Sequence, residues 1–502
     1  MQAQETSTVN WSSKAAFILA AIGSSVGLGN LWRFPFTAGE NGGGAFVLFY
    51  ILCVLLIGFP VLAAELFIGR RGGRSAVGSV VKIAKSEGRS SLWAAQSWLG
   101  MFGSFIILTF YSVIAGWILS YALDIAIDLI QRTARDGVGA LTSGAFAGES
   151  EDQVRGRFNT LLANPTRVLI FHAIFMIVTV GIVAQGVKGG IERTVTILMP
   201  AFFVMLIILF GFALVEGDLK SGANFLIGIR PDQLFSGIRD GSVINAALGQ
   251  AFFSIGLGSA LMLTYGAYMN KSTDIPDSTR VIGVADTVVG IIAGLAIFPI
   301  VFAAGQDPAG GPGLMFLTLP IAFQSMPFGA IFGLVFFLLA FFAAITSSIA
   351  LLESSTKWVD EQSEKNNRFW AALAIGIIVF IIGIGNALST VPKTLADGTP
   401  NITFWNSWTP MGDFPLFEDM TLLDFLSKTT DIILPIAGFI TAVFAGWIIS
   451  QASSREELGF KSEAWYQRWR FLIRWVCPIG IGTVIIYSTI IAPFILPIFG
   501  GE

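Results

Sequence analysis

The sequence predicts an all-α integral membrane protein with about eleven transmembrane helices. Of its 502 residues, 54% are hydrophobic and only 13% are charged, a balance typical of chains with many membrane spans. Apolar runs of the roughly 20 residues needed to cross a bilayer recur along the chain. Two of them are interrupted at mid-membrane by glycine and polar residues, which predicts a helical bundle with two broken helices.

The predicted spans are the apolar runs between turn and charge signals. They cover approximately residues 14–37, 44–70, 93–130, 166–185, 190–215, 242–270, 278–305, 329–358, 368–388, 421–450 and 466–498. Basic residues concentrate in the loops after the second, fourth, sixth, eighth and tenth spans. By the positive-inside rule, the side with these loops and the N-terminus is cytoplasmic, and we expect the protein in the inner (plasma) membrane.

The first span is interrupted within Gly23 to Gly44, GSSVGLGNLWRFPFTAGENGGG. Each glycine lowers helix propensity by about 1 kcal/mol relative to alanine, and Asn30, Arg33 and Pro35 stand beside the glycines. Backbone that leaves the helix in hydrocarbon must be shielded by protein or line a cavity. The stretch therefore predicts an unwound helix at a binding site.

The sixth span repeats the interruption, in AALGQAFFSIGLGSALMLTYGAY. Close helix packing explains glycine pairs, but not the Gln250 and Ser254 beside them. The two broken spans are five helices apart and so run in opposite directions, as an inverted-topology repeat requires. The expected parts are a cytoplasmic segment 1–13, a first repeat 14–215, an extracellular loop 216–241, a second repeat 242–450 with an extracellular cap at 306–328, and a last span with the C-terminus, 451–502. An ordinary mobile loop is the alternative for 306–328.

Ionisable residues inside spans are functional candidates because burying them is costly. Arg33 and Asp424 lie at the predicted outer mouth and could close over a substrate, unless they are unrelated interfacial charges. Glu65 needs a partner, which free N–H groups of the broken sixth span could supply, or it reaches the interface. Asp286 either supports a cation or takes part in proton coupling.

Span eight carries three adjacent hydroxyls, at Thr346, Ser347 and Ser348. Such hydroxyls in membrane helices usually bond back to the preceding turn. Carbonyls freed at Gly23 and Val26 could instead join Thr346 and Ser347 in an all-oxygen shell. A shell without several carboxylates suits Na⁺ rather than Ca²⁺.

Other classes of protein lack the residues they need. The net charge of −3 gives no sign of a nucleic-acid partner, and polar residues clustered at one depth do not form the continuous pore of a channel. An enzyme would need a nucleophile with a base, or a metal cluster, whereas the chain has one histidine, His172, and two cysteines in apolar runs, Cys53 and Cys477. The expected partners are the lipid bilayer and a small molecule. A single copy of the chain is expected to be sufficient for function, and a homodimer is possible.

A set of motifs resembles the neurotransmitter:sodium symporter family, in particular its bacterial amino-acid transporters. The motifs are GLGNLWRFPF followed by ENGGGAF, then ELFIGRRGG, GQAFFSIGLG, AGLAIFP and TSSIA. The likeness covers nearly all of the first ten spans. It implies a sodium-coupled symporter that imports an amino acid by alternating access.

The resemblance implies two sodium sites and a substrate pocket. The first sodium site takes Ser25, Asn30, Ser254 and Asp286 together with the substrate carboxylate; the second takes Gly23, Val26, Ala343, Thr346 and Ser347. The pocket is lined by Ser24, Ser25, Gly29, Ile107, Tyr111, Phe253, Ser254, Gly256, Ser259, Ser347 and Leu351. Tyr111 is expected to hold the substrate carboxylate and Phe253 to form a lid below the gate of Arg33 and Asp424. Glu65 and Gln250 are expected to be structural.

Departures from the family pattern inform the substrate. Gly27 stands where monoamine-transporting relatives carry an aspartate, so the substrate must bring its own carboxylate. Gly256 and Ser259 leave room for a large hydrophobic or aromatic side chain. An importer of a small amino acid or osmolyte, such as glycine, proline or a GABA-like compound, and a transport-silent amino-acid sensor are the alternatives.

A second departure concerns chloride. Chloride-dependent relatives bind the anion with residues matching Tyr50, Gln250 and Ser254 and with an Asn and a Ser, whose positions hold Asp286 and Gly290 here. A fixed carboxylate at 286 predicts transport without chloride. Two sodium ions are then the only cofactors expected.

A third departure concerns the cytoplasmic latch, which in the family pairs an N-terminal Arg with an acid at the end of span eight. The position of the Arg holds Thr8 here, whereas Trp11, Tyr268 and Glu361 match the other members of the latch. We expect an inner gate of these three residues that is held more weakly, or by Lys14.

Overall fold

The computed structural model describes residues 10–307, 313–363, 367–394, 398–412 and 414–495. Within these ranges the chain is helical, and the only extended pairings are two isolated bridges, Ala147 with Glu149 and Thr394 with Pro400. The prediction of an all-α fold is therefore confirmed. Thr8 and residues 308–312 of the predicted cap lie outside the described residues.

The first half of the chain contains the two short pieces of the broken first span and four long helices. Its elements are α1 Lys14–Ser25, η1 Gly29–Arg33, α2 Phe34–Glu40, α3 Gly44–Cys53, η2 Val54–Gly58, α4 Phe59–Gly72, α5 Ala76–Ser86, η3 Ser91–Ala94, α6 Ala95–Asp136, η4 Val138–Thr142, α7 Glu151–Leu162, α8 Pro165–Ala184, η5 Val187–Glu192, α9 Arg193–Glu216, α10 Leu219–Ile227 and α11 Pro231–Asp240.

The second half repeats this plan of short broken helices followed by long ones. Its elements are α12 Ser242–Ile255, α13 Leu261–Ala267, α14 Ile275–Ala303, η6 Leu314–Thr318, α15 Leu319–Ser325, α16 Gly329–Gln362, α17 Arg368–Ser389, α18 Phe404–Ser407, α19 Leu422–Val443, η7 Phe444–Ile448, α20 Gln451–Leu458, α21 Glu463–Phe471, η8 Leu472–Val476, α22 Cys477–Ile486 and η9 Tyr487–Ile495.

Nine helices of the described residues are long and apolar enough to cross a membrane, and the pair Lys14–Ser25 and Gly29–Glu40, bent by 48°, makes a tenth. The predicted sixth span is divided between α12, of 14 residues, and α13, of 7 residues. Neither piece spans a bilayer alone, because about 20 residues are needed. The exact number of eleven spans therefore stays a prediction.

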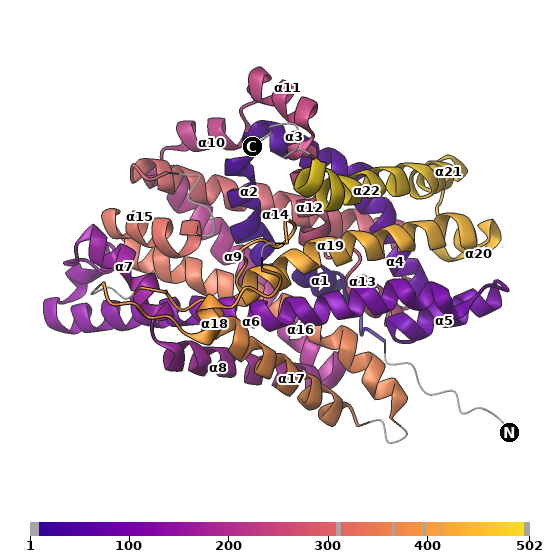
Figure 1. The fold of residues 1–502 in the computed structure, drawn as a ribbon, viewed down its shortest axis with the longest axis horizontal. Helices are drawn as coiled ribbons and strands as arrows, with labels where there is room; N and C mark the ends of the chain where they lie inside the picture. Colours follow the sequence, from indigo (N-terminus) through magenta and orange to yellow (C-terminus); the bar gives the residue numbers. More distant parts are fainter. Residues whose placement is uncertain (1–9, 308–312, 364–366, 395–397, 413, 496–502) are drawn as a thin grey trace.

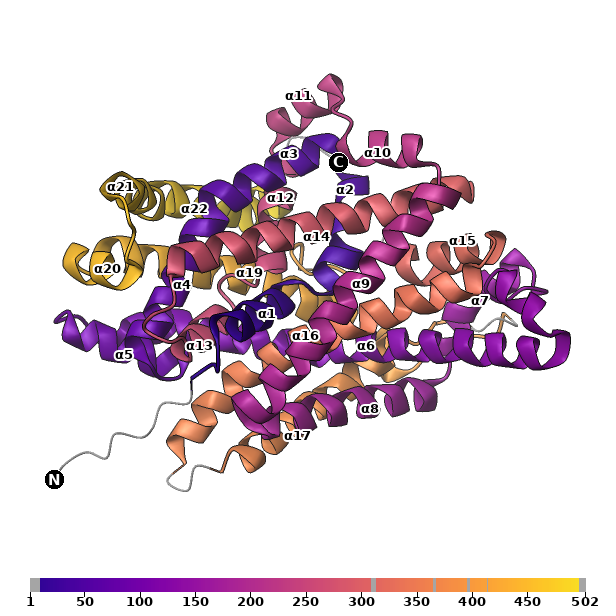
Figure 2. The same ribbon diagram turned by 180° about the vertical axis from the view of Figure 1, so that it is seen from behind.

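The broken helices lie at the centre of the bundle. In Figures 1 and 2, α1, α12 and α13 are surrounded by the long helices α6, α14, α16 and α19. The helices α5, α20 and α21 project together at one end of the molecule, and α7 and α15 lie at the opposite end. The polar breaks are thus shielded by helices on several sides, as irregular backbone in a membrane requires.

The described part of the predicted cap, residues 313–328, is folded rather than a free loop. Phe316 of η6 stacks on Phe158 of α7 with ring centroids 4.9 Å apart and lies 5.7 Å from Trp117 of α6. The hydroxyl of Tyr121 donates to the Phe316 carbonyl at 3.0 Å. The packing of this segment follows its apolar content, whereas its position over an entrance remains a prediction.

Candidate functional site

The first helix break is where the sequence predicts it. Helix α1 ends at Ser25, and Val26 takes an extended conformation before the wider turn of η1 begins at Gly29. The freed backbone N–H of Gly27 donates to the side-chain Oδ1 of Asn30 at 3.1 Å, and that of Leu28 donates to the hydroxyl of Tyr111 at 3.3 Å. Side chains thus replace the hydrogen bonds that the helix loses here.

The second break joins α12 to α13 through backbone of left-handed conformation. Gly256, Gly258 and Ala260 have φ of 73°, 71° and 62°. The N–H of Gly258 donates to Glu65 Oε1 at 2.7 Å, and Glu65 is fully buried in α4. The expected contact between Glu65 and the broken sixth span is confirmed. A Cβ at 258 would lie 2.2 Å from the Leu434 carbonyl oxygen, so only glycine fits there.

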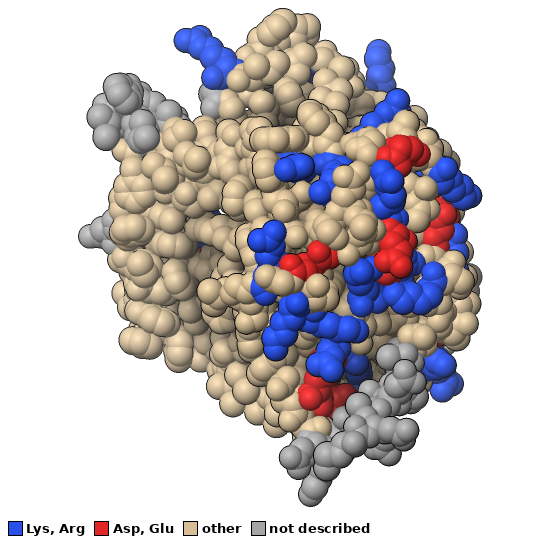
Figure 3. Space-filling view, turned by 90° about the vertical axis from the view of Figure 1, so that its right-hand side faces the viewer, with Lys and Arg blue, Asp and Glu red and all other residues tan. Residues whose placement is uncertain are grey.

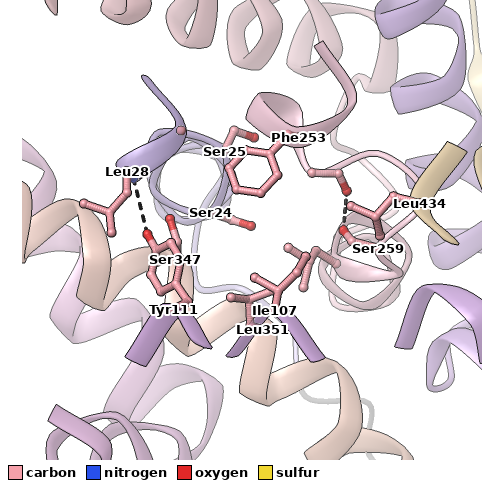
Figure 4. Close-up of a pocket in the computed structure, with 14 residues that line it drawn as sticks. Ser24, Ser25, Leu28, Ile107, Tyr111, Phe253, Ser259, Ser347, Leu351 and Leu434 are labelled. Atoms are coloured by element: carbon pink, nitrogen blue, oxygen red, sulfur yellow. Dashed lines mark hydrogen bonds between the residues drawn. The ribbon is translucent and has the colours of Figure 1, made fainter. Parts of the chain in front are cut away.

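A pocket lies between the two breaks (Figure 4), and its lining includes ten of the residues predicted for it. They are Ser24, Ser25, Gly29, Ile107, Tyr111, Phe253, Gly256, Ser259, Ser347 and Leu351. Ser254 is not among the lining residues, because its hydroxyl is bonded to Asp286. The structure adds Gly27, Leu28, Leu261 and Leu434 to the lining. The three leucines gave no sequence signal, since a leucine in a membrane helix is ordinarily lipid-facing or core.

The pocket has a polar end and an apolar end, and none of its lining residues is charged. At the polar end the Leu28 N–H, the Tyr111 hydroxyl and Ser347 lie together, while Ile107 and Leu351 lie below them in Figure 4. Leu434 and Phe253 form further apolar walls. Such a site suits a molecule with one hydrogen-bonding end and an apolar side chain.

Gly27 leaves no space for a side chain at the polar end. A Cβ built at this position would lie 2.4 Å from Ser347 Oγ and 3.1 Å from the Tyr111 hydroxyl oxygen. Gly256, by contrast, has room, since a Cβ there would meet Leu261 and Ser259 at 3.4 and 3.5 Å. At Gly256 the positive φ, rather than a neighbour, favours glycine.

Three of the four residues predicted for the first sodium site form one buried cluster. Asn30 Nδ2 lies 2.9 Å from Asp286 Oδ1 and 3.0 Å from Ser254 Oγ, and Ser254 Oγ lies 2.9 Å from both carboxylate oxygens of Asp286. The hydroxyl of Ser25 donates to the Ile255 carbonyl at 3.2 Å. The donor set contains a carboxylate and hydroxyl oxygens, which are suitable ligands for a hard cation.

Tyr50 and Gln250, the residues matched to chloride ligands, also lie at this cluster. The Tyr50 hydroxyl donates to Asp286 Oδ2 at 3.0 Å. Gln250 Nε2 donates to the Gly29 carbonyl at 3.1 Å, so it bridges the two broken spans. A Cβ at Gly290 would lie 3.5 Å from the Phe34 ring and 3.7 Å from Asn30 Nδ2.

Three of the residues predicted for the second sodium site, Gly23, Thr346 and Ser347, lie together between α1 and α16. Ser347 Oγ lies 3.4 Å from the Gly23 carbonyl oxygen. Thr346 Oγ1 instead bonds back to the Phe342 and Ala343 carbonyls of the preceding turn, both at 3.1 Å, as such hydroxyls usually do. Val26 is buried at the end of α1. The described residues contain no group of three or more His, Cys, Asp or Glu that could hold a metal. A site of neutral oxygens therefore fits Na⁺ better than Ca²⁺ or Zn²⁺.

The predicted pairing of Arg33 with Asp424 is wrong. Arg33 pairs with Asp431, 2.9 Å away, and its guanidinium carbon lies 4.4 Å from the centre of the Phe253 ring. Asp424 is exposed in the first turn of α19 and accepts a hydrogen bond from Thr421 at 2.7 Å. Asp431 lies seven residues later, two helical turns deeper on the same face, and so it reaches the pocket mouth where Asp424 does not.

Of the three residues predicted for the inner gate, Trp11 and Tyr268 lie in contact, whereas Glu361 bonds to neither of them. The Trp11 indole N–H donates to the Tyr265 carbonyl at 3.2 Å, and the Trp11 backbone N–H donates to the Tyr268 carbonyl at 3.1 Å. The Tyr268 hydroxyl donates at 2.5 Å to Glu353, which is fully buried and pairs with Arg368. A buried acid within an apolar helix was the signal that could have identified Glu353.

Glu361 serves the start of α5 instead. It accepts a hydrogen bond from the Ser75 N–H at 2.6 Å and lies 3.7 Å from Lys357. The beginning of α1 is fastened by other residues, because Lys14 pairs with Asp277 at 2.7 Å and the Ser12 hydroxyl donates to Glu192. Lys14 therefore ties the start of α1 to α14, and its part in an inner closure stays a prediction.

A helical membrane bundle with two broken spans around a pocket and two oxygen-rich clusters is the construction of a secondary transporter. A sequence profile described as "Sodium:neurotransmitter symporter family" matches residues 8–129 and 162–393. The chain belongs to this family of transporters, so it is not an enzyme.

Three relatives illustrate the similarity. The sodium-dependent transporter YhdH of Bacillus subtilis (strain 168) is 34% identical over 493 residues, 97% of this chain and 98% of the relative. The sodium-dependent nutrient amino acid transporter 1 of Drosophila virilis is 26% identical over 97% of this chain and 78% of the relative. The crystal structure of MhsT in complex with L-phenylalanine matches with a TM-score of 0.80 and 37% identity, over 95% of this chain and 99% of that one.

Proposed function

We propose that the protein is a sodium-coupled symporter that imports a neutral L-amino acid with a large hydrophobic or aromatic side chain. The observation that carries this proposal is the polar end of the pocket, where Gly27 leaves no room for an acidic side chain. The Leu28 N–H and the Tyr111 hydroxyl can therefore receive the carboxylate of the substrate. The L-phenylalanine in MhsT and the name of the Drosophila relative support an amino acid.

Two sodium ions accompany the substrate in this proposal. Ser25, Asn30, Ser254 and Asp286 take the first ion together with the substrate carboxylate, which makes the two binding events depend on each other. Gly23, Val26, Ala343, Thr346 and Ser347 take the second. The second cluster joins α1 to α16, so an ion there ties a broken helix to a continuous one. Release of that ion would loosen α1 and allow the inner side to open.

Transport proceeds without chloride in this proposal. The Tyr50 and Ser254 hydroxyls both bond the carboxylate of Asp286, and an anion at this place would be repelled by that carboxylate. The fixed charge of Asp286 thus takes the part that chloride has in chloride-dependent relatives.

The proposed setting is the inner (plasma) membrane, with a cytoplasmic N-terminus and two inverted repeats, 14–215 and 242–450. Trp11, Tyr268 and the Glu353–Arg368 pair would then close the cytoplasmic side. Arg33 and Asp431 would close the outer side over Phe253. Alternating access follows if the two closures open in turn.

Uptake by purified protein in proteoliposomes tests the substrate and the coupling. We expect leucine, phenylalanine or tryptophan to accumulate only with an inward sodium gradient, and faster than glycine, proline or GABA. Gly27→Ala should abolish uptake, whereas Gly249→Ala, at a glycine with nothing within 4 Å of a Cβ, should leave it unchanged. Faster uptake of glycine would contradict the proposed substrate class, and sodium-dependent binding without accumulation would indicate a sensor.

The role of Asp286 is tested by replacing chloride with gluconate. Uptake by the wild type should not change. Asp286→Asn combined with Gly290→Ser restores the Asn and Ser of chloride-dependent relatives, and the space at Gly290 admits the new Cβ. This variant should transport only with chloride; loss of wild-type uptake in gluconate would refute chloride independence.

A further inference from the structure

A cation without an acidic partner among the described residues, Arg474, lies between the last two predicted spans. The guanidinium carbon of Arg474 lies 4.1 Å from the ring centre of Trp447 and 6.0 Å from that of Trp475. The two indoles meet edge to face, with ring centres 4.7 Å apart. Arg474 and Trp475 belong to η8 and Trp447 belongs to η7, so both helices contribute to this contact of one guanidinium with two indoles.

The two helices cross closely at this point. A Cβ at Gly446 would lie 2.9 Å from the Cα of Arg474, so glycine is what allows the close approach. The indole N–H of Trp447 donates to the Arg474 carbonyl at 2.9 Å. Both helices also widen to a π-helical turn here, a local irregularity that often marks functional positions. Backbone contacts, and not the charge of Arg474, therefore hold η7 and η8 together here.

Four other cations at this end of the molecule have acidic partners. Arg70 and Lys271 pair with Glu457, Arg71 pairs with Glu456, and Arg455 pairs with Glu463. Among the described residues no acidic side chain pairs with Arg474, and its Nε is buried without a hydrogen-bond partner. Arg470 is similar, since its guanidinium makes one 3.4 Å hydrogen bond, to Ser454. Two guanidinium groups one helical turn apart are thus left without a counter-charge.

Exposed aromatic side chains accompany these cations. Trp465 and Phe471 are 59% and 60% exposed, and Trp447 and Trp475 are 42% and 46% exposed. Tryptophan rings beside Lys and Arg are typical of the level of the lipid headgroups. Figure 3 shows the end of the molecule that carries α5, α20 and α21, where Lys and Arg gather. Arg474 therefore lies where lipid phosphates would surround the protein.

We propose that Arg474 and Arg470, together with Trp447 and Trp475, bind the headgroup of an anionic phospholipid of the inner leaflet. The lipid phosphate supplies the counter-charge that the protein lacks at this point, and the guanidinium can bind it through two parallel N–H donors. The indoles flank the glycerol region. A basic pocket between helices on the cytoplasmic side is a recognised form of lipid site. This site is distinct from the proposed substrate pocket and does not depend on it.

Native mass spectrometry of the purified protein tests the site with added phosphatidylglycerol and phosphatidylcholine. We expect the wild type to retain one phosphatidylglycerol in preference to phosphatidylcholine. Arg474→Gln should weaken retention about fivefold, the factor that one cation near an anionic lipid contributes. Arg89→Gln, at an exposed cation after α5, is the matched control and should retain the lipid as the wild type does.

A second variant and a competition experiment complete the test. If Arg474→Gln does not fold, Trp475→Leu can replace it. This variant keeps both charges, removes one of the two indoles beside Arg474 and should also weaken retention of phosphatidylglycerol. Inorganic phosphate added in excess should not displace the lipid. Unchanged retention by the folded Arg474 or Trp475 variant, equal retention of phosphatidylcholine, or displacement by inorganic phosphate would each overturn the proposal.

Discussion

The closures proposed for the two sides of the pocket are built differently. At the outer end a single ion pair, Arg33 with Asp431, lies beside Phe253, and its side chains are 27% and 35% exposed. At the inner end Glu353 is fully buried, and its partner Arg368 is 16% exposed. Tyr268 donates to this inner pair, and Trp11 packs against Tyr268 with its ring edge-on. The outer closure is one partly exposed ion pair, whereas the inner closure is a buried network of hydrogen bonds and an ion pair.

This difference indicates which side of the pocket costs more free energy to open. A partly exposed ion pair contributes about 0–1 kcal/mol, so the outer side can open at little cost. Removing one partner of a buried pair costs about 3–5 kcal/mol, because a charge is left unpaired in the interior. The inner side should therefore open only when the buried network is rearranged as a whole.

Arg368→Gln should have the largest effect on this comparison. It leaves Glu353 buried without its partner, and the inner closure should weaken by about 3–5 kcal/mol, about 150- to 4,000-fold in the equilibrium toward the inward-open form. The measurement is the alkylation rate of a cysteine at Thr264, one turn before Tyr268, in a chain whose Cys53 and Cys477 have been replaced.

The double variant Glu353→Gln with Arg368→Gln is the control, because it leaves no unpaired charge. Its alkylation rate should return to within about tenfold of the wild-type rate, since an uncharged pair avoids the penalty. A single variant that labels as slowly as the wild type would show that the network does not hold the inner side closed.

Asp431→Asn should have a smaller effect, at the outer end. It removes the charge opposite Arg33 but leaves the contact of Arg33 with Phe253. The loss of about 1 kcal/mol corresponds to about fivefold faster release of bound amino acid to the outside. Asp424→Asn is the matched control on the same helix face and should release the substrate at the wild-type rate. If the two variants released the substrate equally fast, Asp424 would contribute to the outer closure as much as Asp431, as the sequence predicts.

Asp277→Asn should have the smallest effect. The pair of Lys14 with Asp277 is 47% and 33% exposed, so its loss should speed alkylation at Thr264 less than about fivefold, and less still at high salt. Glu361→Gln keeps an oxygen for the Ser75 N–H and should not change labelling. A larger effect at Glu361 than at Asp277 would mean that Glu361, and not Asp277, holds the start of α1.

The sequence predicts the centre of this molecule better than its ends. The break at Gly23 to Gly44 and the contact of Glu65 follow from residues whose presence in a membrane span is costly. Such residues have few permitted positions. The pocket lining and the cluster of Asn30, Ser254 and Asp286 follow instead from the resemblance to a known family. The buried acid Glu353 is also costly in a membrane span, but the family pattern points to Glu361, eight residues later.

The outer pair was harder to predict for a different reason. Asp424 and Asp431 lie on one face of α19 and differ only in depth, by two turns. The choice between them depends on how far Arg33 reaches, and Arg33 stands at the end of the wide turn of η1, which the sequence does not reveal. The π-helical turns and the helix crossing at Gly446 likewise result from three-dimensional packing and leave no periodic signal in the sequence.

The left-handed backbone at Gly256 also affects how such a transporter can change its substrate. Space alone would admit an alanine at 256, but a left-handed alanine costs about 1–2 kcal/mol, and Gly258 next to it admits no side chain at all. This wall of the pocket is therefore nearly closed to mutation. Ser259, Ile107 and Leu351 present side chains that can vary at lower cost. Relatives that transport a different amino acid should therefore differ at these three positions and keep the two glycines.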